Sequence, residues 1–135
     1  MNAIYEALYD KVNDTPNSFY TSIGGRYYSE KAPQRVTFPY CVGHIITIVP
    51  NDTFEEWLDK IDIQFSIYSN DGCSSIELGN IYEYLKTLFD NKLLTVSGHV
   101  HYNMDRTFAN PRWIPGEEVW QYIVGYTMTI EKNRV

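Results

Sequence analysis

The stretch that decides the fold runs from Leu58 to Asn91 and reads LDKIDIQFSIYSNDGCSSIELGNIYEYLKTLFDN. Its first part alternates apolar and polar side chains, which is the period of a strand with one buried face. Its second part, after the turn residues 69–72, repeats apolar side chains along one face of a helix. The strand positions expected in the core are Ile61, Ile63, Phe65 and Ile67, and the helix positions are Leu78, Ile81, Leu85 and Leu88.

Ser74 and Glu77 have the spacing of a capping box, in which the Glu77 side chain reaches back to the backbone of Ser74. This spacing predicts that the helix begins at Ser74. A strand that leads directly into a helix packed on it is an α+β unit.

The flanking sequence predicts the remaining elements. An amphipathic pattern with Ile4, Leu8 and Val12 on one face predicts an N-terminal helix over residues 2–13, and Pro16 opens a second short helical turn. The nearly continuous apolar run 39–49 is typical of a strand covered on both faces. The expected strands are 26–29, 39–49, 58–69, 96–106 and 119–131, of which the last four form two hairpins.

The fold expected from these elements is α+β. It is a mainly antiparallel sheet of four to five strands, with the N-terminal helix and one long helix packed on it. Residues 1–135 form a single domain, because the chain has no repeat, linker or low-complexity segment. Residues 107–118 would form a long connection between the arms of the second hairpin, and a connection of that length is expected to be functional or mobile.

The composition is that of a globular protein, with 44% hydrophobic and 21% charged residues. The formal net charge of −6 argues against a dedicated nucleic-acid binder, because phosphate contacts require clustered Lys and Arg. Twelve tyrosines slightly favour contact surfaces, since tyrosine is common at interfaces. Neither a signal peptide nor a stretch long enough to span a bilayer is present, which predicts a soluble protein with no membrane partner.

The two cysteines, Cys41 and Cys73, form no metal-binding motif. Cys41 lies within an expected strand, where a small buried thiol is the usual role. Cys73 precedes the long helix and is expected to be partly exposed. A disulfide between them stays open, although two cysteines do not indicate a secreted disulfide scaffold.

His99 and His101 are two residues apart on an expected strand, so both side chains would project from one face. They are candidates for a metal pair, with His44 as a possible third ligand. A metal site also needs further ligands and groups that orient the imidazole rings, and neither is visible in the sequence. Polar surface is therefore the preferred interpretation of this pair, and no cofactor is expected.

No catalytic motif is present, and Gly24-Gly25 is read as a turn because no phosphate-binding Lys-Ser or Lys-Thr follows it. Two carboxylate pairs, Asp59 with Asp62 and Glu55 with Glu56, resemble paired acids but are more simply solvated surface. The sequence places no nucleophile beside a base. We therefore do not expect an enzyme.

Two groups of residues are candidates for contact with other molecules. Arg106, Phe108, Arg112 and Trp113 include the residue types that dominate interface hot spots, so they are candidates for partner contact. The alternative for Trp113 is that it folds over its own sheet and closes the core. The second group lies on the polar face of strand 58–69 and would line a channel or a subunit boundary; it comprises Asp62, Gln64 and Tyr68.

The order of elements, together with several short motifs, resembles the tail-terminator, or tail-completion, proteins of long-tailed bacteriophages and prophages. The resemblance covers essentially the whole chain. Two connections depart from the family pattern by being longer, the one through residues 50–57 and the one through Phe108 and Trp113. The matching segments are the helix 4–12, Gly25-Arg26-Tyr27-Tyr28, Ala32-Pro33, Pro39-Tyr40-Cys41-Val42, Phe65–Ser69 before Ser74, and the closing strand Tyr122–Ile130.

The resemblance implies a structural subunit of the virion, placed at the junction of tail and head and made in the host cytoplasm. Such subunits form a homo-oligomeric ring, commonly hexameric, which caps the tail tube and stops its polymerisation. The ring joins the tail-tube protein to the head connector, and DNA passes through its lumen without sequence-specific binding. A net-negative subunit suits that passage, because acidic walls repel DNA.

Two alternatives stay open at this stage. One is a head-closure or connector component of the same neck, which size and charge do not separate from a tail terminator. The other belongs to a different class, a small soluble metal-binding protein or enzyme that uses His99, His101 and a carboxylate.

Overall fold

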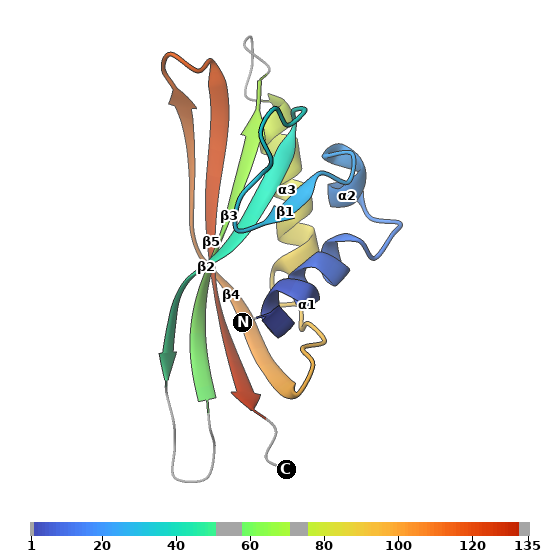
Figure 1. Cartoon of the computed structure of the whole chain (residues 1–135), viewed down its shortest axis with the longest axis vertical. Helices are drawn as coiled ribbons and strands as arrows, with labels where there is room; N and C mark the ends of the chain where they lie inside the picture. Colours follow the sequence, from blue (N-terminus) through green and yellow to red (C-terminus); the bar gives the residue numbers. More distant parts are fainter. Residues whose placement is uncertain (1, 51–57, 71–75, 133–135) are drawn as a thin grey trace.

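The computed structural model describes residues 2–50, 58–70 and 76–132, and it forms a five-stranded sheet with three helices on one face (Figure 1). This architecture confirms the expected α+β class. In chain order the elements are α1 (Asn2–Val12), α2 (Ser18–Ser22), β1 (Tyr27–Ser29), β2 (Tyr40–Pro50), β3 (Leu58–Ser69), α3 (Ile76–Phe89), β4 (His99–Ile114) and β5 (Val119–Lys132).

The strands lie in the order β1-β2-β3-β5-β4. Both expected hairpins form, β2 with β3 and β4 with β5, and the antiparallel pairing of β3 with β5 joins them into one sheet. The short strand β1 pairs with β2 in parallel, which its three residues gave no means of predicting. The last strand of the chain thus lies inside the sheet, between β3 and β4.

The core lies between the sheet and the helices. The alternation in β3 is confirmed, because Ile61, Ile63, Phe65 and Ile67 are at most 1% exposed. The same holds for one face of β5, where Val124, Tyr126, Met128 and Ile130 are buried. α3 contributes Leu78, Ile81, Leu85 and Phe89, while the expected core residue Leu88 is only partly buried.

The start of α3 at Ser74 and the proposed capping box lie outside the described residues. Within them, Glu77 accepts a hydrogen bond from the Ser69 hydroxyl at 2.8 Å, which ties the first turn of α3 to the end of β3. The expected short helix after Pro16 is present as α2, capped by the Asn17 side chain, which accepts the Tyr20 N–H at 2.7 Å.

The expected long connection 107–118 is wrong. β4 continues to Ile114, and residues 108–114 pair with β5 up to Val119, so only the four residues 115–118 join the strands. Pro111 fits within β4 because β4 is an edge strand, where a proline need not remove a ladder hydrogen bond. A register shift between Arg106 and Phe108 absorbs the one irregular residue.

The expectation that β2 is covered on both faces is also wrong. Its first residues, Cys41 and Val42, are buried, but Ile46 and Val49 are 49% and 51% exposed. Tyr5 of α1 accepts the N–H of Ile45, at 3.1 Å, next to the register shift that follows this residue. The helix layer thus contacts β2 at this point, and the remainder of the strand extends past it with half-exposed apolar side chains.

Figure 1 shows the sheet strongly twisted, with all three helices on one side of it. The turn of the β4–β5 hairpin projects past the helices at one end of the molecule, and the end of β2 projects at the other. The opposite side of the sheet carries no helix, and we call it the open face. It carries the even-numbered residues of β3 and the odd-numbered residues of β5, because their neighbours on each strand point into the core.

Candidate functional site

The open face carries a row of side chains that crosses four strands in register. Arg112 on β4 lies opposite Gln121 on β5, Gln121 opposite Tyr68 on β3, and Tyr68 opposite Tyr40 on β2. Arg112 Nε donates to Gln121 Oε1 at 2.7 Å, and Gln121 Nε2 donates to the Tyr68 hydroxyl at 3.0 Å. The Tyr68 and Tyr40 rings stack with centroids 4.9 Å apart. We call these four residues the polar row.

The polar row brings together two residues that the sequence placed in separate groups. Arg112 was a candidate for partner contact, and Tyr68 was a candidate for a channel or subunit boundary. Sequence reasoning missed Gln121, which connects them and is 5% exposed. The only signal for Gln121 was its place among the alternate residues of β5, and its partners follow only from the strand register.

Asp62 lies further along the open face, at the centre of a second polar contact. Its carboxylate accepts hydrogen bonds from Thr127 Oγ1 on β5 at 2.7 Å and from Thr47 Oγ1 on β2 at 2.8 Å. These two hydrogen bonds hold the pKa of Asp62 below its usual range, and the bond from Thr127 has the larger effect. Gln64, the next candidate along β3, donates to Ser66 Oγ at 3.5 Å. The polar side chains of β3 are thus largely engaged with the sheet itself.

A pocket of about 340 Å³ lies where the segment after β1 passes over the open face. Residues 30–33 form one wall, and Tyr40, Tyr68, His44 and Ser66 contribute to the rest. The Nδ1 atom of His44 is buried and has no hydrogen-bond partner among the described residues. His44 is separated from β4 by β3 and β5, which places it on a different part of the sheet from His99 and His101.

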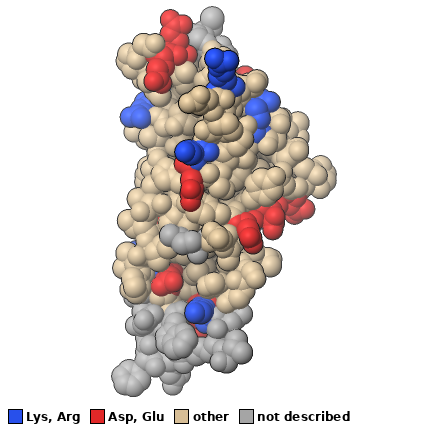
Figure 2. Space-filling model, viewed as in Figure 1, with Lys and Arg blue, Asp and Glu red and all other residues tan. Residues whose placement is uncertain are grey.

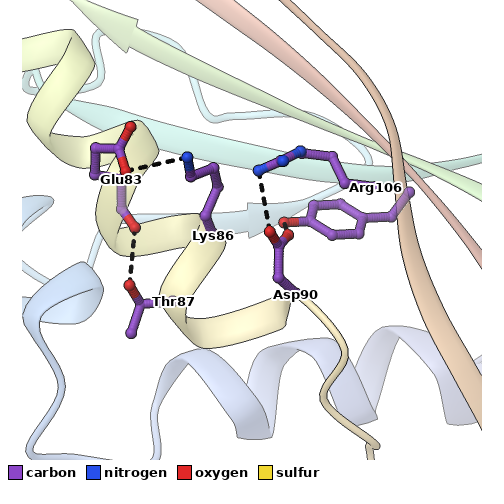
Figure 3. Close-up of polar contacts among 6 residues, drawn as sticks. Glu83, Lys86, Thr87, Asp90 and Arg106 are labelled. Atoms are coloured by element: carbon purple, nitrogen blue, oxygen red, sulfur yellow. Dashed lines mark hydrogen bonds and ion pairs between the residues drawn. The ribbon is translucent and has the colours of Figure 1, made fainter.

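Arg106 belongs to the helix side of the sheet and not to the open face. It lies opposite Tyr126 and forms an ion pair with Asp90 just after α3, with Nη1 and Oδ2 3.0 Å apart. Figure 3 shows Arg106 pointing toward Asp90, while Lys86 on α3 pairs with Glu83. The Tyr126 hydroxyl donates to the other oxygen of Asp90. Burial, and then this bond to Asp90, raises the pKa of Tyr126. Arg106 therefore joins β4 to the end of α3.

Phe108 and Trp113, the other two candidates for partner contact, lie on opposite faces of β4. Phe108 lies opposite Gly125 on the open face, and a Cβ at Gly125 would come within 2.2 Å of its ring. Trp113 lies on the helix side, where it meets Trp120 edge to face with ring centroids 5.2 Å apart. Trp113 is 36% exposed and is not part of the buried core cluster. The four candidates thus form no single patch.

The two histidines of β4 are occupied by the backbone. His101 Nδ1 accepts the Leu94 N–H at 2.8 Å, so Nε2 carries the proton and donates to the Asn103 carbonyl. Burial lowers the pKa of His101, which favours this neutral form. His99 Nδ1 lies 2.8 Å from the carbonyl oxygen of Ser97. In this arrangement His101 presents no ring nitrogen to a metal ion.

The other candidate groups are also separated. Asp59 lies opposite Ile130 on the core side of β3, whereas Asp62 lies on the open face, so the two carboxylates point apart. Glu55, Glu56 and Cys73 lie outside the described residues. Cys41 is fully buried with a free thiol, and burial raises the pKa of that thiol. Within residues 2–50, 58–70 and 76–132, no three His, Cys, Asp or Glu side chains gather as metal ligands do.

Two of the motifs behind the family resemblance touch each other. Arg26 Nε donates to the Pro39 carbonyl at 3.0 Å, and Arg26 Nη2 to the Phe38 carbonyl at 3.3 Å. The Gly-Arg-Tyr-Tyr segment, which leads into β1, therefore holds the Pro-Tyr segment that opens β2. Tyr27 packs against Gly43 so closely that a Cβ there would lie 2.1 Å from its hydroxyl oxygen. These residues build the edge of the sheet.

Charged side chains are scattered over the face seen in Figure 2, and most of that face is uncharged. Acidic side chains gather over the tip of the β4–β5 hairpin, where Glu117 and Glu118 are exposed. None of the helices among the described residues is long and apolar enough to cross a membrane.

Comparison with known proteins gives a likeness in structure only. No family model and no curated protein matches the sequence. A chain from the virion of a native gene transfer agent particle superimposes with a TM-score of 0.83 over 93% of this chain and 92% of its own length, at 10% identity. A second solved structure, which carries no functional name, superimposes with a TM-score of 0.63 over 99% and 96%, at 11% identity. At these identities the matches show a shared fold along nearly the whole chain.

Proposed function

We propose that this chain is a structural protein of a phage-like particle and that it acts by assembly, without catalysing a reaction. The observation that carries the proposal is the near full-length match to a chain from the virion of a native gene transfer agent particle. The match covers 93% of the chain and 92% of its counterpart, so it extends over nearly the whole fold. A shared fold alone does not fix a function, so the proposal also draws on the sites.

Within such a particle, the chain would act as a tail terminator. It forms a ring, six-fold by the family resemblance, that caps the tail tube, stops its polymerisation and joins it to the head connector. The contact between Arg26 and the carbonyls of Phe38 and Pro39 supports this assignment, because it gives the two family motifs one shared structural role. The protein would therefore be found in the virion, at the junction of tail and head.

The open face is the surface we assign to the lumen of the ring. Asp62, Gln64 and Tyr68 lie on β3, which is the central strand of the five and is remote from both sheet edges. Subunits that meet through their edges would leave these side chains facing the channel. An ionised Asp62 and a net charge of −6 would repel DNA and let it pass without binding.

The first experiment is to determine the oligomeric state of the purified chain by light scattering and negative-stain electron microscopy. We expect rings, either in isolation or after addition of tail-tube protein from the same particle. The second is to delete the gene from a strain that produces the particles. We expect tubes of uncontrolled length and heads without tails, both restored by the wild-type gene.

The alternatives give different results in these experiments. A head-closure component would leave tube length normal while heads and tails stay apart. A protein that remains monomeric with tube protein present, and whose loss leaves particles intact, would overturn the proposal.

A further inference from the structure

The sheet ends in two different edge strands, β4 on one side and β1 on the other. At one edge, the β4 residues 105–113 are exposed to solvent, and β4 pairs on its other side with β5. At the other edge lies β1, which covers only Cys41–Gly43 of β2. Arg112, at the β4 edge, belongs to the same row as Tyr40 on β2. Tyr28 on β1 belongs to the neighbouring row, which runs through Val42 and ends at Asn110 on β4. Arg112 and Tyr28 are therefore related diagonally, a separation that a long side chain can span.

Continuing the sheet from one copy to the next would bring β4 against β1 in the antiparallel sense. β1 runs parallel to β2. The pairings of β2 with β3, of β3 with β5 and of β5 with β4 are all antiparallel, so the strand direction reverses three times across the sheet. β4 therefore runs opposite to β1. Antiparallel contacts are the commoner kind between strands.

The backbone of these edges is poorly suited to a long hydrogen-bonded ladder. The Tyr27 N–H is already turned back to the Gly25 carbonyl at 3.0 Å, and the Ser29 carbonyl already accepts the Lys31 N–H at 2.9 Å. Pro111 on β4 has no N–H to donate. Such features block indiscriminate strand addition at an edge. A specific contact between these edges must therefore rely on side chains.

The side chains at the two edges are complementary. Arg112 uses Nε for Gln121, and no described residue is paired with its two terminal amino groups. Tyr28 alternates with the buried Tyr27, so its ring lies on the open face, edge-on to Tyr40 with centroids 6.3 Å apart. A planar guanidinium stacks well on a tyrosine ring, and the bond to Gln121 already fixes its orientation.

We propose that copies of this chain meet edge to edge, with β4 of one copy against β1 of the next and the guanidinium of Arg112 stacked on Tyr28 of that next copy. This inference rests on the proposed ring and names its subunit contact. The two edges are different surfaces, so the contact is heterologous and repeats from copy to copy. A heterologous repeat closes into a ring when the rotation between neighbouring copies closes on itself, and the proposed ring requires that closure.

Cross-linking tests the contact while leaving Arg112 and Tyr28 in place. In a Cys73→Ser background, one variant carries Asn110→Cys on β4 and another carries Lys31→Cys just after β1; both positions are exposed. Mixing the two variants with a short bismaleimide should give a covalent pair of chains. The matched control replaces Asn110→Cys by Thr87→Cys, which is exposed on α3, and should give none with the Lys31→Cys variant.

Assembly measurements test the side chains themselves. Arg112→Gln and Tyr28→Leu should each raise the protein concentration needed for ring formation, by roughly 2- to 30-fold for loss of one such stacking contact. The two changes combined should cost no more than the larger of them, because they remove the same contact. The control Lys60→Gln removes a cation from the open face of β3, away from both edges, and should leave assembly unchanged.

The outcomes separate this inference from the proposed function. Rings that form normally but give no cross-link between Asn110→Cys and Lys31→Cys, or that are unaffected by Arg112→Gln, would overturn the edge contact and leave the terminator role standing. A chain that never associates would overturn both. Circular dichroism of each variant shows that an effect on assembly does not come from loss of the fold.

Discussion

Replacing Gly43 by alanine should destabilise the fold through a single steric contact. A Cβ at this position would lie 2.1 Å from the Tyr27 hydroxyl oxygen and 3.2 Å from Cε1 of Phe65. Tyr27 is 3% exposed and Phe65 is 0% exposed, so neither ring can move into solvent without opening the core. Overpacking of this kind costs about 1–3 kcal/mol of unfolding free energy. A strand alanine regains only about 0.5–1 kcal/mol of backbone entropy relative to glycine, so the net effect is a loss of stability.

The assay is urea unfolding of the purified chain followed by circular dichroism. Gly79→Ala provides the matched control, because no atom outside its own helix lies within 4 Å of a Cβ built there. That change should stabilise the protein by about 0.5–1 kcal/mol, as alanine does in the interior of a helix. The two glycine-to-alanine changes should therefore move the unfolding midpoint in opposite directions.

A double-mutant cycle with Tyr27→Phe identifies the atom responsible. The Tyr27 hydroxyl is buried and no described residue hydrogen-bonds to it, so its removal alone should be neutral or stabilising. Phenylalanine also removes the atom that the new methyl group would strike, so it should recover most of the stability lost in Gly43→Ala. If Gly43→Ala is as stable as the wild type, or if Tyr27→Phe recovers nothing, the packing argument fails.

Three further predictions concern the polar groups. Asp90→Asn should lower the unfolding free energy measured in urea by about 1–2 kcal/mol, because it removes the ion pair with Arg106 and weakens the hydrogen bond from the buried Tyr126. The control Glu83→Gln removes the more exposed pair with Lys86 and should lower it by less than about 0.5 kcal/mol. The pKa of Asp62 is lowered in the folded state, so the stability that its carboxylate contributes is complete above the unfolded pKa and is lost as the pH falls through the folded pKa. The difference in unfolding free energy between wild type and Asp62→Asn should therefore narrow over that pH range. A difference that does not change with pH would contradict the hydrogen-bonded, ionised state of Asp62. The lowered pKa of His101 means that stability should decline as the pH falls below the unfolded value of about 6.5, and nitrogen NMR should show the Nε2–H tautomer above that pH.

The sequence predicted the parts of the fold that local periodicity determines. Ile61 and Phe65 alternate with polar neighbours, and the structure buries them beneath α3 as expected. The extent of β4 was not predictable from local sequence. A proline such as Pro111 disrupts a central strand but is tolerated on an edge strand, and only the strand order of the whole sheet shows that β4 is an edge strand. The parallel pairing of β1 depends on the distant contact from Arg26 to the Pro39 carbonyl.

The candidate site depended even more on long-range register. Arg112 and Tyr68 are 44 positions apart by their numbers in the chain, and only the pairing of β5 with both β4 and β3 places them in one row. Conversely, Arg106 and Arg112 are near each other in sequence but lie on opposite faces of β4, because a register shift separates them. Residue type identified the interaction-prone side chains, and the strand order decided which of them share a surface.

The position of β5 inside the sheet has a consequence for how the chain must be made. Until β5 has left the ribosome, β3 and β4 have no common partner, and each presents an unpaired edge with apolar side chains on one face. Such edges are the usual starting points of aggregation. A nascent chain that ends before Val119 therefore cannot close its core or align the polar row. Folding of the sheet, and any association of subunits that depends on its edges, must wait until synthesis of this strand is complete.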